Sequence, residues 1–524
     1  MKFFAEILPV ALVLAQGVAA TPYRKRQSDL NSTQEQQRAA AVAETFQIAW
    51  NGYHQYAFPH DELHPLSNSW GDPRNGWGAS AVDGLDTAIL MGNTEIVETI
   101  LNWLPTVDWG NTTESVSLFE TTIRYLGGML SGKSEAARAL LASYDLLKGP
   151  CANLTSNATA VDALLTQAKS LADHLSFAFD TPTGIPYNGL DVVNKNGTGP
   201  TNGLATIGSL VLEWTHLSDL LGDDTYANLT QKAQSYLLNP NYAEGYSSPW
   251  PGLLGTNVDI DSGLFQDATG GWDGGDDSYY EYLIKMWVYD QSRFGTYRDA
   301  WIQAADSTIE HLGSQPNVRP DLTFLGNYVN STVYYTSGHL ACFAGGNFIL
   351  AGSTLGEQKY TDFGLQLTAG CEGLYNQTVT GIAPGGFGWS PDGSNIPSDQ
   401  EDFYNTAGYW MTDKSYILRP EAIESMYYAY RITGDSIYQD WAWNAYLAVN
   451  ASCAAGSGYA ELQDVNTTSL SWNDDQDTFF FAEVLKYAYL IHTPDALYQT
   501  DVNGTNSYVF NTEAHLFKVA GVPV

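Results

Sequence analysis

The sequence predicts an all-α toroid, in which an inner ring of helices is wrapped by an outer ring. Helical runs end at glycine and are followed directly by a second helical run. The first run of each pair is apolar nearly all round and the second is amphipathic, which is typical of a buried helix followed by a surface helix. Acidic residues recur inside the apolar runs. An open solenoid of such pairs is the alternative, but the irregular spacing of the pairs and the recurring acids favour a closed ring.

Glycine marks the end of the apolar runs, because glycine readily adopts the left-handed conformation that ends a helix. A polar residue follows, and the residue four positions after the glycine is apolar or aromatic, so that it can pack back on the helix. The clearest cases are Gly92 with Ile96, Gly222 with Tyr226, Gly356 with Tyr360 and Gly434 with Tyr438. Each unit therefore predicts an αα-hairpin.

Two segments rich in glycine and proline, 239–261 and 383–399, separate these units. Such compositions favour turns over regular elements. We expect both segments to be loops over one mouth of the ring, where connecting segments commonly carry function.

Five apolar and aromatic runs carry acids that a buried helix does not normally contain. The runs span 117–128, 209–222, 277–290, 419–434 and 479–491, and their acids are Glu120, Glu213, Asp277, Glu281, Glu421, Glu424 and Glu483. Burying a carboxylate is costly unless a partner compensates its charge. Because each of five helices carries at least one acid, we expect these acids to converge on a single polar site.

The N-terminus has the pattern of a secretory signal peptide over residues 1–20. A lysine near the start, a short apolar run and the small-residue exit Val18-Ala19-Ala20 form this pattern. Residues 21–26 are expected to be a short pro-segment, so that one domain occupies residues 27–524. A type II anchor in the endoplasmic reticulum or Golgi is the alternative, but Glu6 interrupts the apolar run, which is short for a spanning helix.

Sequons for N-glycosylation agree with secretion. They are Asn31, Asn111, Asn153, Asn157, Asn196, Asn228, Asn330, Asn376, Asn450, Asn466 and Asn503.

The formal net charge of −35 excludes some partners. With 23 Lys and Arg against 58 Asp and Glu, the chain lacks the basic groups that nucleic-acid phosphates require. An anionic membrane surface is disfavoured for the same reason, and we expect no stable membrane insertion. The acidity indicates solubility in an acidic or extracellular medium, and we expect a monomer.

The four cysteines are too few for a disulfide scaffold and too dispersed for a zinc site. Cys342 and Cys371 can close a loop worth roughly 3–4 kcal/mol through the entropy of the unfolded chain. Cys151 and Cys453 can pair or remain free.

Beyond these patterns, the chain resembles the class I α-1,2-mannosidases, glycoside hydrolase family 47, in their secreted fungal type. The resemblance extends from about His60 to His515 and rests on segments that occur in order: NGWGASAVDGLDTAILMG, FETTIRYLGG, DSYYEYLIK, SGHLACFAGGNF, ILRPEAIES, FAEVLKYAYL and VFNTEAH. It implies a single catalytic (α/α)7 barrel over residues 27–524. It also implies Ca²⁺-dependent hydrolysis of terminal α-1,2-linked mannose from high-mannose N-glycans, with inversion of configuration.

The resemblance also implies roles for individual residues. Inverting hydrolysis needs one carboxyl group that protonates the leaving oxygen and a second that deprotonates the attacking water. Glu120 matches the leading general acid, Asp277 the other acid candidate, and Glu421 the base. The apolar neighbours of Glu120 are consistent with a carboxyl group that stays protonated. The matching substrate-binding positions are Arg124, Glu213, His339, Arg419, Glu424, Phe479, Glu483 and Glu513.

By the same resemblance, Ca²⁺ is held by the hydroxyl and the carbonyl oxygen of Thr512. Calcium takes six to eight hard oxygen ligands, so waters and sugar hydroxyls would complete the shell. The carboxylates that match the positions holding these waters are Glu213, Glu424, Glu483 and Glu513. A divalent cation would then neutralise a buried cluster of acids.

The chain departs from the family pattern in three places. Gly275 replaces the Arg of selective members or the Leu of broad ones, which predicts room for different oligosaccharide branches. Gln476-Asp477-Thr478 replaces a common Met-Glu-Ser, and the segment 132–142 is additional.

Two other functions compete with hydrolysis of mannose. A non-catalytic mannose-binding lectin of the degradation-enhancing type is disfavoured because Glu120, Asp277 and Glu421 are retained. Another toroidal glycosidase such as a glucoamylase is compatible with the architecture alone, but the segment around Thr512 argues against it.

Overall fold

Seven inner helical segments form a closed ring in the computed structural model, which describes residues 32–130, 143–501 and 505–524. Each segment contacts the next, and α2 contacts η5 to close the ring. The inner segments are α2 (Ala79–Leu90), the consecutive turns α4 (Leu118–Glu120), η2 (Thr121–Leu126) and α5 (Gly127–Met129), then α8 (Leu204–Gly208) with α9 (Val211–Leu221), α11 (Asp277–Tyr289), α13 (Phe343–Leu355), α16 (Glu421–Thr433), and η5 (Phe480–Val484) with α18 (Leu485–Leu490).

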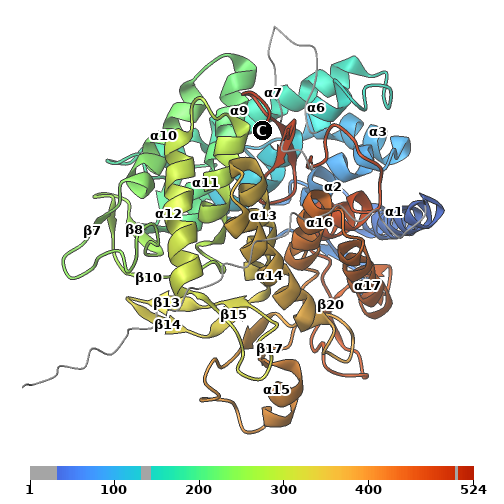
Figure 1. Cartoon of the computed structure of the whole chain (residues 1–524). Coiled ribbons are helices and arrows are strands. Elements are labelled where there is room, and N and C mark those ends of the chain that lie inside the picture. The colour runs from blue at the N-terminus through green and yellow to red at the C-terminus, as the bar shows by residue number, and fades with distance from the viewer. Residues whose placement is uncertain (1–31, 131–142, 502–504) are drawn as a thin grey trace, which may run out of the picture.

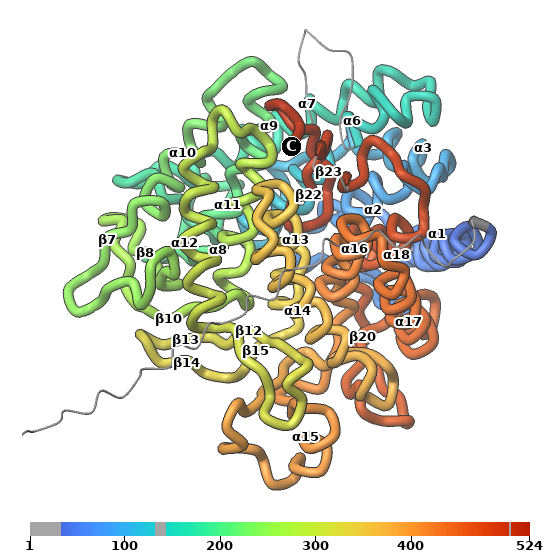
Figure 2. Tube along the Cα trace, viewed as in Figure 1, coloured from blue at the N-terminus to red at the C-terminus, as the bar shows by residue number. Residues whose placement is uncertain are grey.

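Seven outer helices pack against this ring in the same described part of the chain. They are α3 (Thr94–Trp103), α7 (Ala158–Leu175), α10 (Thr225–Leu238), α12 (Gly295–His311), α14 (Gln358–Tyr375), α17 (Ile437–Ser452) and α1 (Ser32–Tyr56). The N-terminal helix α1 packs on the C-terminal α18 and completes the outer ring, as Figure 2 shows at the right of the molecule. The predicted all-α toroid, an (α/α)7 barrel, is confirmed (Figure 1).

The remaining helical pieces are short. They are η1 (Leu104–Thr106), α6 (Ser143–Leu147), η3 (Ser176–Phe179), η4 (His339–Cys342) and α15 (Glu401–Ala407). Among the residues that the structure describes, no helix combines the length and the apolarity needed to cross a bilayer. The predicted signal peptide at 1–20, the predicted pro-segment at 21–26 and the additional segment 132–142 lie outside the described residues.

The four predicted glycine ends adopt the left-handed backbone. The φ angles are 72° at Gly92, 63° at Gly222, 69° at Gly356 and 67° at Gly434. The residues four positions further on are all buried, as expected for a contact with the preceding helix; they are Ile96, Tyr226, Tyr360 and Tyr438. Glycine position therefore correctly predicted where inner helices end.

Short strands, paired antiparallel except for β7 with β9, lie between the helix pairs and were not predicted from the sequence. The segments 239–261 and 383–399 are not loops throughout, because they contribute β7 and β8 to a four-stranded sheet and β16 to a three-stranded sheet. Crossovers over a barrel mouth bury backbone polar groups, and strand pairing satisfies these groups.

The strands are brief. Their bounds are β1 (Glu62–His64), β2 (Ser69–Gly71), β3 (Val116–Ser117), β4 (Gly189–Asp191), β5 (Asn196–Thr198), β6 (Thr201–Gly203), β7 (Asn241–Tyr242), β8 (Asn257–Asp259), β9 (Leu264–Phe265), β10 (Thr269–Gly270), β11 (Gly313–Ser314), β12 (Phe324–Leu325), β13 (Asn327–Val329), β14 (Thr332–Tyr334), β15 (Thr336–Gly338), β16 (Gly386–Gly388), β17 (Trp410–Asp413), β18 (Ala454–Ala455), β19 (Gly458–Tyr459), β20 (Glu461–Leu462), β21 (Trp472–Asn473), β22 (Tyr508–Phe510) and β23 (Leu516–Lys518).

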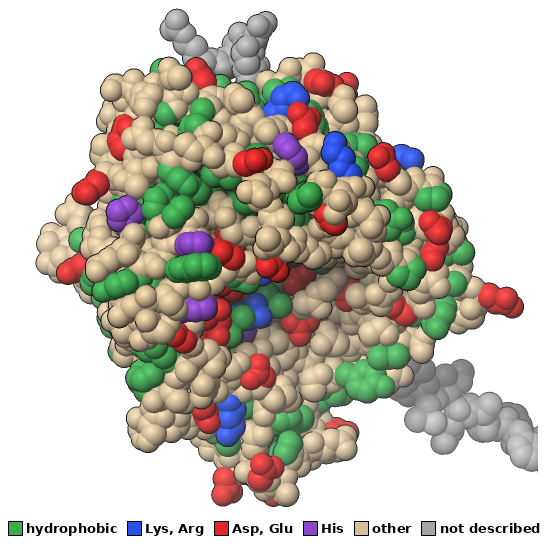
Figure 3. All heavy atoms as spheres, turned by 180° about the vertical axis from the view of Figure 1, so that it is seen from behind, with side chains coloured by type: hydrophobic (Ala, Val, Ile, Leu, Met, Phe, Trp, Pro, Cys, Tyr) green, Lys and Arg blue, Asp and Glu red, His purple; other side chains and the backbone are tan. Residues whose placement is uncertain are grey.

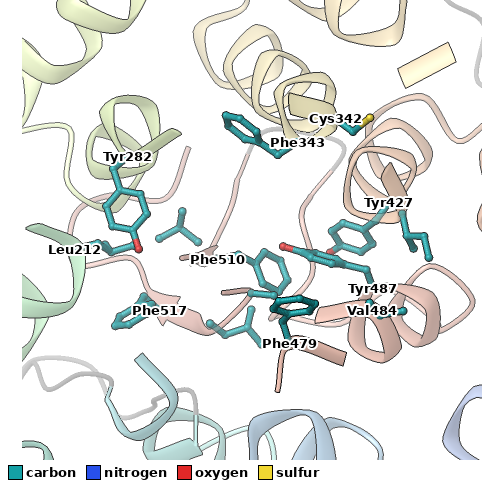
Figure 4. Packing of buried hydrophobic residues seen from close by; sticks show 14 of the residues in the cluster. Leu212, Tyr282, Cys342, Phe343, Tyr427, Phe479, Val484, Tyr487, Phe510 and Phe517 are labelled. Atoms are coloured by element: carbon teal, nitrogen blue, oxygen red, sulfur yellow. The ribbon is translucent and has the colours of Figure 1, made fainter. Parts of the chain in front are cut away.

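The hairpin β22–β23 fills the centre of the ring. Phe510 pairs with Leu516 across the hairpin. Figure 4 shows Phe510 and Phe517 between the helices, with Tyr282, Tyr427 and Tyr487 around them. The centre of the barrel is therefore packed with aromatic side chains, and the connecting turn of the hairpin lies at its core.

Cys342 and Cys371 form a disulfide that ties the end of η4 to α14, as the sequence allowed. The other two cysteines, Cys151 and Cys453, are free.

We predict that Gly222→Ala destabilises the protein, while Gly295→Ala does not. A Cβ at either position meets no atom within 4 Å, so only the backbone distinguishes them. Gly222 has a φ of 63°, where an L-residue costs about 1–2 kcal/mol. Gly295 lies at ordinary φ at the start of α12, where alanine stabilises by roughly 0.4–1 kcal/mol. Denaturant unfolding measures both; equal stabilities would contradict the assignment.

Candidate active site

A cavity of about 330 Å³ opens where the inner helices begin. Figure 3 shows a hollow in the molecular surface in which acidic and basic side chains gather. Thirteen of the residues singled out in the sequence line this one cavity. They are Glu120, Arg124, Gly275, Asp277, Glu281, Arg419, Glu421, Glu424, Asp477, Phe479, Glu483, Thr512 and Glu513. Six of the seven acids expected to converge, all except Glu213, are among them.

Two of the expected substrate-binding residues, Glu213 and His339, do not line the cavity. Both are buried, at 0% and 1% exposure. Glu213 lies behind the turn that carries Thr512, and His339 lies behind Glu421, as their hydrogen bonds below show. His339 contacts Glu421 of the cavity wall, and Glu213 contacts Asn511, which precedes the cavity residue Thr512.

Several of the cavity acids lie in the first turn of an inner helix. Asp277 is the first residue of α11, and Glu421 and Glu424 lie in the first turn of α16. The partial positive charge at the N-terminus of a helix stabilises a carboxylate there. Glu120 ends α4, whose first turn is capped by the Ser117 side chain. A helical ring with parallel inner helices thus concentrates carboxyl groups at one end.

Glu120 is held by two arginines. Its Oε2 accepts a hydrogen bond from Arg124 Nε at 2.8 Å and lies 3.7 Å from Arg74 Nε. Burial by itself raises the pKa of Glu120, but the two guanidinium groups outweigh it and lower that pKa below its ordinary value. Glu120 is therefore ionised in the free protein, which differs from the expectation of a protonated carboxyl group. Its apolar sequence neighbours gave no sign of the arginines.

Asp277 has the opposite electrostatics. Burial, with the nearby carboxylates of Asp273, Glu281 and Glu421, raises the pKa of Asp277 to about 7. Its Oδ1 accepts hydrogen bonds from the Ser278 backbone N–H at 2.8 Å and from the Ser278 hydroxyl at 3.5 Å. Asp277 therefore holds its proton at mildly acidic pH.

Glu421 is an ionised carboxylate with a fixed orientation. Its Oε2 lies 2.6 Å from His339 Nδ1, and the other ring nitrogen of His339 lies 2.8 Å from the Tyr375 hydroxyl. Burial raises the pKa of Glu421, but the bond to His339 and the charge of Arg419, 3.7 Å away, outweigh it, so that this pKa is lowered. His339 positions Glu421.

The floor of the cavity carries more acid than base. Burial raises the pKa of Glu424 and of Glu513 to about 8, and raises that of Glu483 well above its ordinary value. Eight carboxyl groups line the cavity, namely Glu120, Asp277, Glu281, Glu421, Glu424, Asp477, Glu483 and Glu513, against the guanidinium groups of Arg74, Arg124 and Arg419. A cation bound here would favour the ionised form of these carboxyl groups and neutralise their charge.

The turn Asn511–His515 brings Thr512 and Glu513 to this floor. Asn511 Nδ2 donates to Glu213 Oε1 at 2.8 Å, and the Thr512 backbone N–H donates to the Tyr282 hydroxyl at 3.3 Å. Glu213 Oε2 is buried without a hydrogen-bond partner, and burial raises the pKa of Glu213 to about 7. Glu513 pairs with Arg124.

Backbone strain accompanies two of these segments. Leu418, just before Arg419, has a φ of 65°, and Ala514, just after Glu513, has a φ of 57°. Both side chains are fully buried. Such residues in the left-handed region persist where the surrounding structure holds them, often at functional sites.

The donors around Thr512 fit a hard divalent cation. A hydroxyl, a carbonyl oxygen and under-neutralised carboxyl groups are the oxygen ligands that Ca²⁺ prefers, and the orphaned Glu213 Oε2 is suited to accept from a water of such an ion. Among the described residues, no three His, Cys, Asp or Glu side chains form a direct metal-binding group. The arrangement therefore suits an ion held by Thr512 and waters rather than by a carboxylate cage.

Sequence analysis did not select some of the residues that line the cavity. Arg74 precedes the ring in an irregular segment, and its contact with Glu120 depends entirely on the tertiary fold. Asp477 lies 3.6 Å from Arg74 and was noted only as a departure from the family pattern. Gly275, which the sequence had indicated as a position with room for oligosaccharide branches, lines the cavity with a φ of 101°, so any side chain there would be strained.

Paired carboxyl groups of opposite protonation in one cavity are the arrangement that an inverting glycoside hydrolase needs. A sequence profile described as glycosyl hydrolase family 47 matches residues 45–519. The chain belongs to this family and is a glycoside hydrolase. Mannosidases of the family depend on a metal ion.

Curated relatives and a solved structure agree over almost the whole chain. A mannosyl-oligosaccharide α-1,2-mannosidase of Penicillium citrinum is 52% identical over 513 residues, 97% of this chain and 98% of that protein. Mannosyl-oligosaccharide α-1,2-mannosidase 1B of Aspergillus phoenicis is 53% identical over 97% of this chain and 98% of its own. The structure of an α-1,2-mannosidase from Trichoderma reesei has a TM-score of 0.88 at 51% identity, covering 92% of this chain and 99% of that one.

We predict that Lys486→Met is severely destabilising. The Lys486 ammonium is fully buried, 2.9 Å from Asp86 and donating to the Ala514 carbonyl at 2.7 Å. Its loss leaves Asp86 with His515 alone, and breaking a buried pair costs about 3–5 kcal/mol. The exposed pair Lys359–Asp306, at 2.6 Å, is the matched control, because Lys359→Met should cost about 0–1 kcal/mol. Thermal unfolding compares them, and similar losses would contradict the prediction.

Proposed function

We propose that this protein hydrolyses terminal α-1,2-linked mannose from high-mannose glycans with inversion of configuration. The observation that carries the proposal is the pair of carboxyl groups in one cavity: Asp277 with a pKa raised to about 7 and Glu421 with a lowered pKa. Both relatives described above are named mannosyl-oligosaccharide α-1,2-mannosidases, which supports the linkage and the sugar. A lectin would have no need for two carboxyl groups poised in opposite protonation states.

In the proposed reaction Glu421 is the general base. Its carboxylate, oriented by His339, accepts a proton from a water that attacks the anomeric carbon. Asp277 donates its proton to the departing oxygen, because its pKa keeps it protonated at mildly acidic pH. The electrostatics favour Asp277 over Glu120 for this step. Glu120 instead fixes Arg124, and together with Arg419 these groups are placed to bind sugar hydroxyls.

We further propose that the metal ion is Ca²⁺, held by the hydroxyl and carbonyl oxygens of Thr512. When bound, such an ion supplies a positive charge that orients the hydroxyls of the terminal mannose. The carboxyl groups that would hold its waters are Glu213, Glu424, Glu483 and Glu513, and their raised pKa values support a cation among them.

We propose that the protein is secreted as a monomer. The N-terminal pattern supports secretion, and so do the exposed sequon asparagines among the described residues. These are Asn111, Asn153, Asn196, Asn228, Asn330 and Asn376.

We predict a bell-shaped dependence of kcat/KM on pH. Asp277 must be protonated, so activity falls as the pH rises through about 7. Glu421 must be ionised, so activity falls on the acidic side, below the ordinary glutamate pKa.

Glu421→Gln and Asp277→Asn should each lose about 10²–10⁴-fold in kcat. The exposed Glu401 on α15 is a control, and Glu401→Gln should keep wild-type rates.

The measurement is release of mannose from α-1,2-mannobiose, with the anomer of the product followed by proton NMR. Initial formation of the β-anomer is expected. Initial α-mannose would rule out inversion, and full activity in Glu421→Gln would remove its role as base.

We also predict that chelation with EDTA abolishes activity and that Ca²⁺ restores it. Binding to the folded state alone also raises the melting temperature with ligand concentration. This rise should be present in the wild type and in the exposed control Thr106→Ala, and lost in Thr512→Ala. Full activity in EDTA would exclude the ion, and an unchanged thermal shift in Thr512→Ala would place it elsewhere.

A further inference from the structure

Trp70 is a tryptophan left half exposed, beside the cavity wall. Its exposure is 47%, and it is the sole tryptophan among the exposed large hydrophobic residues of the described chain. Exposing so large an apolar surface forgoes the stabilisation that its burial would give. A ligand that covers the ring would recover that stabilisation.

One face of the indole ring packs against a neighbouring imidazole, which fixes its orientation. The ring of His60 stacks on it with centroids 3.4 Å apart and planes inclined by 5°. His60 is itself fixed, because its Nδ1 lies 2.9 Å from Asp72 Oδ2, and Asp72 Oδ1 accepts from the Asp61 backbone N–H at 3.1 Å. One face of Trp70 is thus covered by imidazole, while the residue as a whole remains 47% exposed. A fixed aromatic face loses little conformational entropy when it binds.

The chain brings Trp70 close to residues that line the cavity. Trp70 lies in β2, which pairs with β1, and Leu63 of β1 bridges to Gln476, next to the cavity residue Asp477. Arg74, four residues after Trp70, lines the cavity. Four residues span at most about 14 Å of chain, so Trp70 is within reach of an oligosaccharide whose terminal residue occupies the cavity.

Arg74 and Asp477 of the cavity lining offer charged groups to a sugar. Arg74 Nη2 lies 3.6 Å from Asp477 Oδ2, and Arg74 Nε lies 3.7 Å from Glu120 Oε2. Sugar hydroxyls can donate to a carboxylate and accept from a guanidinium. A sugar also presents an apolar C–H face, which suits an aromatic ring.

We propose that Trp70, backed by His60, is a subsite for a mannose residue distal to the cleaved bond. This inference rests on the proposed hydrolysis of high-mannose glycans. The exposed indole face stacks on the C–H face of a mannose residue further along the same oligosaccharide. Trp70 therefore sets the preference for long substrates over a disaccharide and has no part in bond cleavage.

Comparison of two substrates tests the subsite. In Trp70→Ala, KM for Man9GlcNAc2 should rise about tenfold, equivalent to about 1.4 kcal/mol, with kcat nearly unchanged. The kinetic constants for α-1,2-mannobiose, which is too short to reach the ring, should stay at wild-type values. Trp70→Phe should lose less, because a smaller aromatic face remains. The melting temperature reports whether each variant is folded.

Ile437→Ala is the matched control. Ile437 is 44% exposed and is the first residue of α17. It follows the C-terminal end of α16, whereas Glu421 lies at the N-terminal end of that helix. Its truncation should therefore leave the kinetic constants for both substrates unchanged. An unchanged KM for Man9GlcNAc2 in Trp70→Ala would overturn the subsite. Equal losses on both substrates would also overturn it, because they would indicate a structural role. Absence of mannose release from either substrate by the wild type would instead refute the proposed function.

Discussion

The turn Asn511–His515 is the constraint on which the rest of the structure depends. It closes a hairpin inserted in the barrel, and its groups bond to several inner helices. Asn511 contacts Glu213 of α9 and the Ile123 carbonyl of η2, its carbonyl accepts from Lys285 of α11, and Lys486 of α18 donates to Ala514. Because these bonds are buried, the ring cannot change shape without breaking them.

Charge is organised in two layers around this turn. Beneath it, fully buried His515 lies 3.3 Å from both Asp83 and Asp86 of α2, and these charges compensate one another. Above it, the acids that face the cavity outnumber the arginines. The lower layer fixes the position of Thr512 and Glu513, while the upper layer keeps an unbalanced charge that sugar and cation can use.

The different protonation of similar carboxyl groups follows from their neighbours. Glu120 and Glu421 each have a cationic or hydrogen-bonding partner, and Asp277 is surrounded by other acids. All three lie at or near helix starts, so secondary structure does not distinguish them. Elements distant in sequence, such as the segment of Arg74 and the short helix of His339, make the difference.

The sequence by itself determined the ring, because glycine ends and alternating apolar and amphipathic runs are local signals, and because acids in apolar helices require a common polar site. It also indicated most of the carboxyl groups that meet there, although Glu213 does not line the cavity and Asp477 does. Only the tertiary structure decided the protonation of these groups and the burial of His339 and Glu213 behind the cavity wall. It also decided the strands between the helix pairs and the exposure of Trp70. These features depend on burial and on electrostatic interactions between segments that are distant in the sequence, so no periodic sequence pattern predicts them.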